Sequence, residues 1–156
     1  MAIAKAVSEF LTKKNVSFGT VAHPKSSSSC ETAHAAHIPE DHLAKSVLLK
    51  DEKGYLLAVV PASEWISLDR LNDELNRDLQ LVPEEEMDQL FSDCQPGAIP
   101  PLGEAYGIET IVDDALHALS KVYFEAGDHK QLIQVNSEQF HTLMKGLRHG
   151  YYCKSN

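Results

Sequence analysis

The chain has 156 residues, of which 43% are hydrophobic and 24% are charged. This length is typical of one domain, and the composition excludes a disordered or fibrous protein. No apolar segment approaches the roughly 20 residues that a membrane-spanning helix needs, and the first residues lack the apolar run of a signal peptide. The three widely spaced cysteines (Cys30, Cys94 and Cys153) predict no disulfide framework. We therefore expect a single cytoplasmic domain over residues 1–156.

The net charge of −9 is distributed unevenly along the chain. Residues 51–114 carry three basic and sixteen acidic side chains, whereas residues 1–50 and 115–156 each have a net charge of +2. Because the acidic middle segment repels a polyanion, the charge distribution argues against non-specific binding of nucleic acid over a broad basic surface. Contact with one short piece of nucleic acid remains open.

The first part of the chain predicts two helices and a hairpin. The predicted elements are, in order, a helix over residues 3–14, a short strand over 16–22, a helix over 31–37, and strands over 45–50 and 55–60. Serines 26–29 are expected to cap the second helix and Pro39 to end it. The apolar runs of the hairpin are nearly continuous, which predicts that both faces of its sheet are covered.

The rest of the chain mixes helices and strands without regular β–α–β alternation. The predicted elements are a helix after Ser67 through Leu75, a strand over 79–82, a helix that begins at Pro83, strands over 108–112, 122–125 and 131–135, and a last helix capped by Ser137. Residues 94–103 hold three prolines and two glycines and are predicted to form a loop. This order favours a mixed α/β domain with a curved, barrel-like mixed β-sheet surrounded by helices.

Several enzyme classes have no support in the sequence. It contains no Gly-x-Gly-x-x-Gly, no Gly-x-x-x-x-Gly-Lys-Ser/Thr, no Gly-x-Ser-x-Gly and no His-Glu-x-x-His pattern, which argues against nucleotide hydrolysis and serine hydrolase chemistry. Cys30, His34 and His37 would share one helix face and could bind a metal. Solvent-facing histidines are the favoured interpretation, because no fourth ligand has a diagnostic spacing.

The loop at residues 94–103 has a chemistry of its own. Gly97, Ala98 and Ile99 each offer a backbone N–H, and Pro100 and Pro101 fix the direction of the chain. Such a loop could present preorganised donors to a carbonyl oxygen that develops negative charge, although a rigid surface loop is the simpler interpretation.

Two cationic or titratable side chains add to this pattern. Lys45 begins a strongly apolar strand, where it either extends to water or binds phosphate or carboxylate as a point charge. His129 lies in a predicted turn beside Gly127 and Asp128, where it is either exposed or part of a binding turn.

Together these places resemble the YbaK/prolyl-tRNA synthetase-associated editing domain family. Four segments carry the resemblance in the family's order and spacing: His23-Pro-Lys-Ser, Ala44-Lys-Ser-Val-Leu-Leu-Lys50, Gly97-Ala-Ile-Pro-Pro-Leu-Gly103 and Tyr123-Phe-Glu-Ala-Gly-Asp-His129. No single segment is decisive, but the set of four is specific. The resemblance covers residues 16–146, and the chain looks like a free-standing member.

The resemblance implies hydrolysis of the ester that joins a wrong amino acid to the terminal ribose of a tRNA. It gives Lys45 the central role in activity and the loop from Gly97 to Pro101 the binding of the aminoacyl carbonyl. It implies no metal and no organic cofactor. The predicted site residues are catalytic Lys45, Gly97 and His129, with substrate binding by His23, Ser46, Ala98, Ile99, Pro100, Pro101, Gly127 and Asp128.

The physical chemistry of the residues is compatible with this activity. An aminoacyl ester is already activated, so an enzyme needs donors for the carbonyl oxygen and a held water more than a nucleophile. We expect Lys45 to hold the terminal ribose or phosphate while a water attacks, with the free ribose hydroxyl as proton acceptor and His129 orienting the water or the α-amino group.

The predicted partner is the acceptor end of a mischarged tRNA, with a small amino acid on tRNA(Pro) as the first candidate and no membrane partner. A monomer or weak oligomer suffices. Basic side chains that could contact the tRNA are Lys25, Lys45, Lys50, Lys130, Lys145 and Arg148. Two alternatives stay open: a non-catalytic module that binds an aminoacyl or nucleotide end, and a small metal-binding protein that uses Cys30, His34 and His37.

Overall fold

The computed structural model describes residues 3–24, 29–95 and 98–154. Its helices are α1 (Lys5–Lys13), α2 (Ser29–Ala35), α3 (Leu68–Leu75), α4 (Glu84–Leu90), α5 (Asp114–His117) and α6 (Ser137–Leu143), with 3-10 turns η1 (Glu40–His42) and η2 (Gly103–Tyr106). Its strands are β1 (Gly19–Ala22), β2 (Leu43–Asp51), β3 (Gly54–Pro61), β4 (Trp65–Ile66), β5 (Gln80–Leu81), β6 (Glu109–Asp113), β7 (Lys121–Glu125), β8 (Gln131–Asn136), β9 (Arg148–Gly150) and β10 (Cys153–Lys154).

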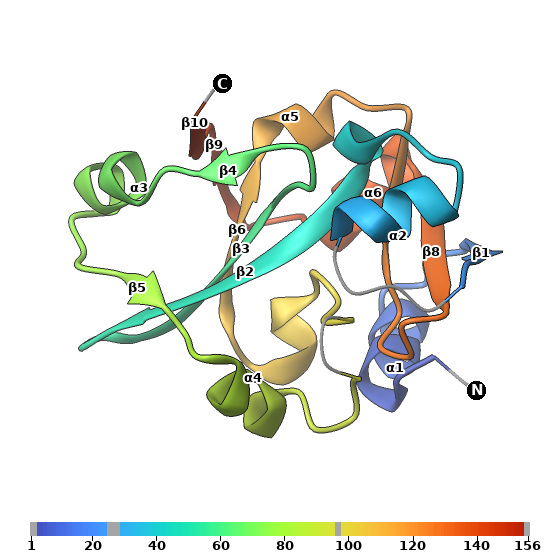
Figure 1. Ribbon diagram of the computed structural model, residues 1–156, viewed down its shortest axis with the longest axis horizontal. Coiled ribbons are helices and arrows are strands. Elements are labelled where there is room, and N and C mark those ends of the chain that lie inside the picture. The colour runs from blue at the N-terminus through green and yellow to red at the C-terminus, as the bar shows by residue number, and fades with distance from the viewer. Residues whose placement is uncertain (1–2, 25–28, 96–97, 155–156) are drawn as a thin grey trace.

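Eight of these strands form one mixed sheet in the order β1-β8-β7-β2-β3-β6-β9, with β5 paired to β2. The β2–β3 and β7–β8 hairpins are antiparallel, whereas β2 runs parallel to β7 and β3 runs parallel to β6. In Figure 1 the long β2–β3 hairpin crosses the molecule, with α3 and α4 near one end and α1, α2 and α6 around the β1–β8–β7 end. The predicted mixed α/β class, with helices around a mixed sheet, is confirmed.

The central hairpin is buried on both sides, as its apolar sequence predicts. On one face Val59 packs in an apolar cluster with Phe10 of α1 and Phe140 of α6. On the other face Val60 packs with Leu71 of α3. Each buried leucine or valine side chain of this kind contributes about 1.5–3 kcal/mol, so the hairpin is the energetic centre of the fold.

Three helix boundaries differ from the predictions. Helix α2 ends at Ala35, because His37 adopts a left-handed φ of 59° and the N–H of Ile38 donates to the carbonyl of Ala33 at 3.0 Å. This Schellman geometry ends the helix before Pro39 is reached. Helix α6 is capped by Asn136 in a capping box with Gln139, not by Ser137. Pro83 is the residue before α4 and not its first residue.

The short elements β4, β9, β10 and α5 were not predicted. They have two to four residues each, and so short a segment carries no readable periodicity. Of the predicted caps for α2, serines 26–28 lie outside the described residues.

Within the described residues, no helix is both long and apolar enough to span a membrane. Cys94 and Cys153 are free thiols whose pKa burial raises to about 12.

Candidate functional site

The turn between β7 and β8 is built from the sequence Glu125-Ala-Gly-Asp-His129. Gly127 has a φ of +100°, which a residue without a side chain adopts at little cost. A Cβ atom at this position would lie 2.6 Å from the Cβ of Ala4, so the turn packs directly against the start of α1. Asp128 Oδ1 accepts hydrogen bonds from the N–H groups of Lys130 and Gln131, both at 3.0 Å. The turn is therefore rigidly held.

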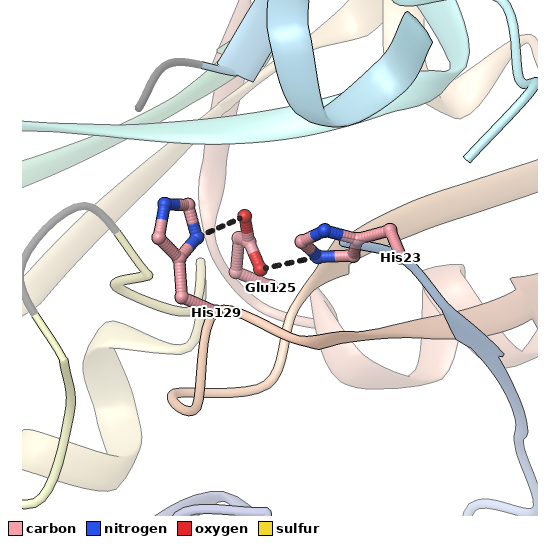
Figure 2. Close-up of side chains that lie close together, drawn as sticks. All are labelled: His23, Glu125 and His129. Carbon is pink, nitrogen blue, oxygen red and sulfur yellow. Dashed lines mark hydrogen bonds and ion pairs between the residues drawn. The ribbon is translucent and has the colours of Figure 1, made fainter. Parts of the chain in front are cut away.

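This turn presents His129 to two other buried polar side chains. His129 Nδ1 lies 3.0 Å from Glu125 Oε2, and His23 Nε2 lies 3.4 Å from Glu125 Oε1. All three residues are at least nine-tenths buried. Figure 2 shows the carboxylate between the two imidazoles, with the second ring nitrogen of His129 pointing away from it. His23 directly follows β1, which pairs with β8. The N–H of His23 donates to the carbonyl of Lys130 just before β8, and this bond holds His23 beside the turn.

The face of the sheet that carries Glu125 is covered by α2. Tyr123 packs with Ala33 of α2, and Glu125 follows two residues later on the same side of β7. The hydroxyl of Thr32 on α2 donates to Glu125 Oε2 at 3.3 Å. Burial raises the pKa of the Glu125 carboxyl, and the two neighbouring imidazoles act in the opposite direction.

Lys45 lies on the strand beside this cluster. The parallel register of β2 and β7 pairs Ala44 with Phe124, so Lys45 and Glu125 are the next residues along two neighbouring strands. Lys45 is half-buried; its Nζ donates to the carbonyl of Glu64 at 2.8 Å and lies 5.3 Å from the centre of the Trp65 ring. The lysine is therefore held by a carbonyl and an aromatic face and extends toward an exposed tryptophan.

Ser46 connects the same strand to the proline-rich loop. Its Oγ donates to the carbonyl of Ile99 at 3.2 Å, and as the next residue it points to the face of β2 opposite to Lys45. Pro100 and Pro101 are buried, which differs from the rigid surface loop of the simpler interpretation. The structure thus brings Ser46 to the predicted carbonyl-binding loop, while the contacts of Lys45 are on the other side of the strand.

One of the backbone N–H groups predicted to bind the substrate already donates a hydrogen bond within the loop. The N–H of Ala98 donates to the carbonyl of Gln95 at 3.0 Å, and Ala98 is fully buried. The prediction that this N–H is free for a substrate oxygen is wrong for this conformation, because a tight turn in the loop uses it. Gly97 lies outside the described residues. Among the described residues, the N–H of Ile99 donates to no backbone carbonyl, so Ile99 keeps the predicted donor role as a proposal.

Other predicted residues are dispersed. His34 and His37 are exposed, and His37 lies beyond the end of α2, which removes the shared helix face on which the metal hypothesis for Cys30, His34 and His37 rested. Lys50 is bound by Glu86 at 2.7 Å, which raises the lysine's pKa. Lys130, Lys145 and Arg148 are exposed, and Lys25 lies outside the described residues.

Glu125 and Thr32 are not among the site residues predicted from the sequence. Glu125 ends a predicted strand, and nothing in a strand pattern shows that its side chain is buried. One signal was present: an acid that directly follows the apolar run Val122-Tyr-Phe and stands four residues before a histidine, across a glycine turn. That spacing can bring a carboxylate and an imidazole together.

The comparisons with known proteins agree with this fold. The family model of the aminoacyl-tRNA editing domain matches residues 23–143, a range that begins at His23 and includes Lys45 and His129. The chain therefore belongs to the aminoacyl-tRNA editing domain family. This confirms the resemblance that the four sequence segments indicated. A search of curated proteins gave no match.

Solved structures with the same fold cover nearly the whole chain. The hypothetical protein APE2540 superimposes with a TM-score of 0.83 at 18% identity, over 96% of this chain and 100% of its own. A protein provisionally assigned as a trans-editing enzyme for prolyl tRNA synthetase gives 0.82 at 21% identity, over 97% of both chains. A provisionally assigned signal transduction protein from Marinobacter aquaeolei VT8 gives 0.80 at 22% identity, over 96% of this chain and 30% of its own. At these identities the likeness establishes the fold.

Proposed function

We propose that this editing domain is an aminoacyl-tRNA deacylase that acts in trans on a mischarged tRNA. The observation that carries the proposal is the match of residues 23–143 to the editing family, within which His23 and His129 meet around a buried carboxylate beside the Lys45 strand. Buried titratable groups of this kind are typical of a catalytic or binding site.

In the proposed reaction the oxygen of a water attacks the ester carbonyl carbon. The bond from that carbon to the ribose oxygen breaks, and the ribose oxygen takes a proton, which leaves a free amino acid and an uncharged tRNA. The N–H of Ile99 stabilises the negative charge on the carbonyl oxygen. Because the loop with Ile99 lies against Ser46, on the face of β2 opposite to Lys45, this role requires the substrate to extend past the end of that strand. The free hydroxyl of the terminal ribose accepts the water's proton and passes its own proton to the departing ribose oxygen, so no general base from the protein is needed.

Three side chains have proposed positioning roles. Lys45 exchanges its contact with the Glu64 carbonyl for the ribose or phosphate of the terminal nucleotide. His129, fixed through Nδ1 by Glu125, uses its outward nitrogen to orient the attacking water. Asp128 Oδ2 is buried without a hydrogen-bond partner among the described residues, and it receives the α-ammonium group of the amino acid.

The proposed substrate is a small amino acid on tRNA(Pro), and one of the similar structures is named as a trans-editing enzyme for prolyl tRNA synthetase. The acidic charge of residues 51–114 restricts the contact to the acceptor end, which a few exposed basic residues such as Lys130 can reach. Selection among small amino acids rests on the shape of the binding site, because one methylene changes binding by only about 1–3 kcal/mol.

A deacylation panel tests this proposal. The purified protein is incubated with tRNA(Pro) and tRNA(Ala), each charged with alanine, cysteine, serine, threonine or proline. We expect hydrolysis of one or two mischarged species, with correctly charged Pro-tRNA(Pro) left intact. Absence of turnover on every member, combined with retained binding of the same tRNAs, would replace the enzyme by a non-catalytic module that binds an aminoacyl end.

A further inference from the structure

We propose that His23, Glu125 and His129 form a binding site for a divalent metal ion, with Zn²⁺ as the best-matched metal. The ligand atoms of the three residues all lie within 4.8 Å of one another and all three residues are buried. Among the described residues, no other group of three or more histidine, cysteine or acidic side chains meets these conditions. The proposal departs from the expectation of no metal, and it does not depend on the proposed deacylase activity.

The hydrogen bonds of His23 show which of its ring nitrogens carries a proton. His23 Nδ1 lies 2.8 Å from the carbonyl oxygen of Pro24, which can only accept a hydrogen bond, so Nδ1 carries the proton. In a neutral imidazole Nε2 then carries a lone pair and no proton, and this nitrogen lies 3.4 Å from Glu125 Oε1. Both atoms are buried, and neither has a hydrogen-bond partner in the described part of the chain. Two facing acceptors in a buried site require a cation between them or beside them.

Neighbouring groups hold two of the three candidate ligands in place. A histidine that binds a metal usually donates its other ring N–H to a carbonyl or carboxylate, which fixes the ring and leaves the lone pair toward the metal. His23 has this arrangement through Pro24. The carboxylate of Glu125 is likewise held from outside the cluster by the hydroxyl of Thr32 at 3.3 Å. Such contacts orient ligands before a metal arrives.

The spacing and the type of the three ligands suit zinc. In a tetrahedral zinc site with bonds of about 2.0–2.2 Å, neighbouring ligand atoms lie about 3.3–3.5 Å apart. The two histidine–glutamate contacts, at 3.0 and 3.4 Å, reach different oxygens of the carboxylate, and one ligand atom of each residue lies within 4.8 Å of the other two. Metal binding would therefore draw the three ligand atoms together by up to about 1.5 Å. Two imidazoles and one carboxylate suit zinc, whereas calcium and magnesium prefer oxygen ligands throughout. Neutral His129 would bind through Nδ1 and carry its proton on Nε2.

The competing explanation is that a proton on His23 Nε2, and not a metal ion, satisfies Glu125 Oε1. If His23 is an imidazolium ion, its Nε2–H satisfies Glu125 Oε1 without any metal. The two explanations differ in what the free protein does with zinc, and the measurement needs no tRNA. Its failure therefore leaves the deacylase proposal standing, and failure of the deacylation panel leaves the metal proposal standing.

The test is metal binding by the full chain after treatment with a chelator. Zn²⁺ is titrated calorimetrically, and Co²⁺ is titrated with visible absorption as a report of the coordination number. We expect one tightly bound ion per chain and the intense bands of four-coordinate Co²⁺. The substitutions His23→Ala and Glu125→Gln should each weaken zinc binding by more than about 100-fold. This loss is larger than the one expected when a residue that only hydrogen-bonds a metal ligand is removed.

A matched control is available on the surface. His149 Nδ1 lies 2.8 Å from Asp114 Oδ1, a similar histidine–carboxylate pair, but its side chain is 63% exposed. The substitution His149→Ala should leave the tight site unchanged. Circular dichroism and thermal unfolding of each variant separate a lost ligand from a lost fold, and Glu125→Gln preserves the side-chain shape. Absence of tight zinc binding by the unmodified chain, or equal binding by a folded His23→Ala variant, would overturn the proposal in favour of a protonated His23.

Discussion

Replacing Lys45 by methionine is expected to lower the single-turnover rate constant of deacylation by about a hundredfold or more. Methionine keeps most of the apolar length of the side chain, so packing against Trp65 is retained while the charge is lost. The ester must be held in a fixed position for a water to attack it, and loss of one preorganised polar contact typically costs about 2.7–4 kcal/mol in the transition state. The measurement is hydrolysis of the best substrate of the panel with enzyme in excess.

Lys50 is the control for this prediction. It lies on the same strand and is a lysine of similar exposure, but Glu86 binds its Nζ at 2.7 Å at the far end of the hairpin. Because an exposed ion pair contributes at most about 1 kcal/mol, the substitution Lys50→Met should leave the rate constant within a few-fold of that of the unmodified protein. Equal activities of the Lys45 and Lys50 variants would remove Lys45 from the mechanism.

Replacing Gly127 by alanine is expected to reduce the free energy of unfolding by about 2–4 kcal/mol. Two costs add: the backbone has a φ of +100°, and the new Cβ would lie 2.6 Å from the Cβ of Ala4. The N–H of Ala4 also donates to the carbonyl of Ala126 at 2.9 Å, so the N-terminal segment cannot move aside without losing this bond. Urea unfolding followed by circular dichroism measures the loss.

A pair of further variants separates the two costs. Gly107 has a φ of +70° with no atom near its potential Cβ, so Gly107→Ala should show the backbone cost alone, about 1 kcal/mol. Adding Ala4→Gly to Gly127→Ala should recover part of the loss, because it removes the clashing methyl group. If Gly107→Ala and Gly127→Ala cost the same, the close approach of the turn to α1 contributes nothing.

Much of the fold was predictable because its signals are local. The hairpin around residues 51–54 has apolar strands on either side of a glycine turn, and the structure pairs Asp51 with Gly54 at that turn. Ser67 caps the helix that follows it, because its hydroxyl oxygen accepts a hydrogen bond from the N–H of Arg70. These features depend on residues within a few positions of one another.

The errors arose where two local signals competed. Pro39 is a strong helix breaker, but His37 ends α2 earlier by adopting a left-handed conformation. Ser137 and Asn136 are both good caps, and Asn136 caps the helix because Gln139 Oε1 can also accept a hydrogen bond from the N–H of Asn136. A sequence pattern cannot rank two such residues, since their difference is smaller than the effect of the packing around them.

The candidate site was predictable only in part. His23, Lys45 and His129 were found through their motifs, but their mutual arrangement depends on β1, β7 and β2 lying near one another in the sheet. The role of Glu125 follows from its burial beneath α2, which connects residues 93 positions apart. The use of the Ala98 N–H inside its own loop could not be predicted, because it depends on the exact path of the backbone.

The contact between Lys45 and Trp65 also gives the protein an optical property. Trp65 is the one tryptophan in the sequence, and it is 65% exposed. Its fluorescence therefore comes from a single indole, 5.3 Å from the ammonium group proposed to hold the substrate. A nucleotide that draws Lys45 away, or that stacks on the ring, changes the emission directly. Binding can thus be followed in real time on the unlabelled protein, independently of whether the ester is cleaved.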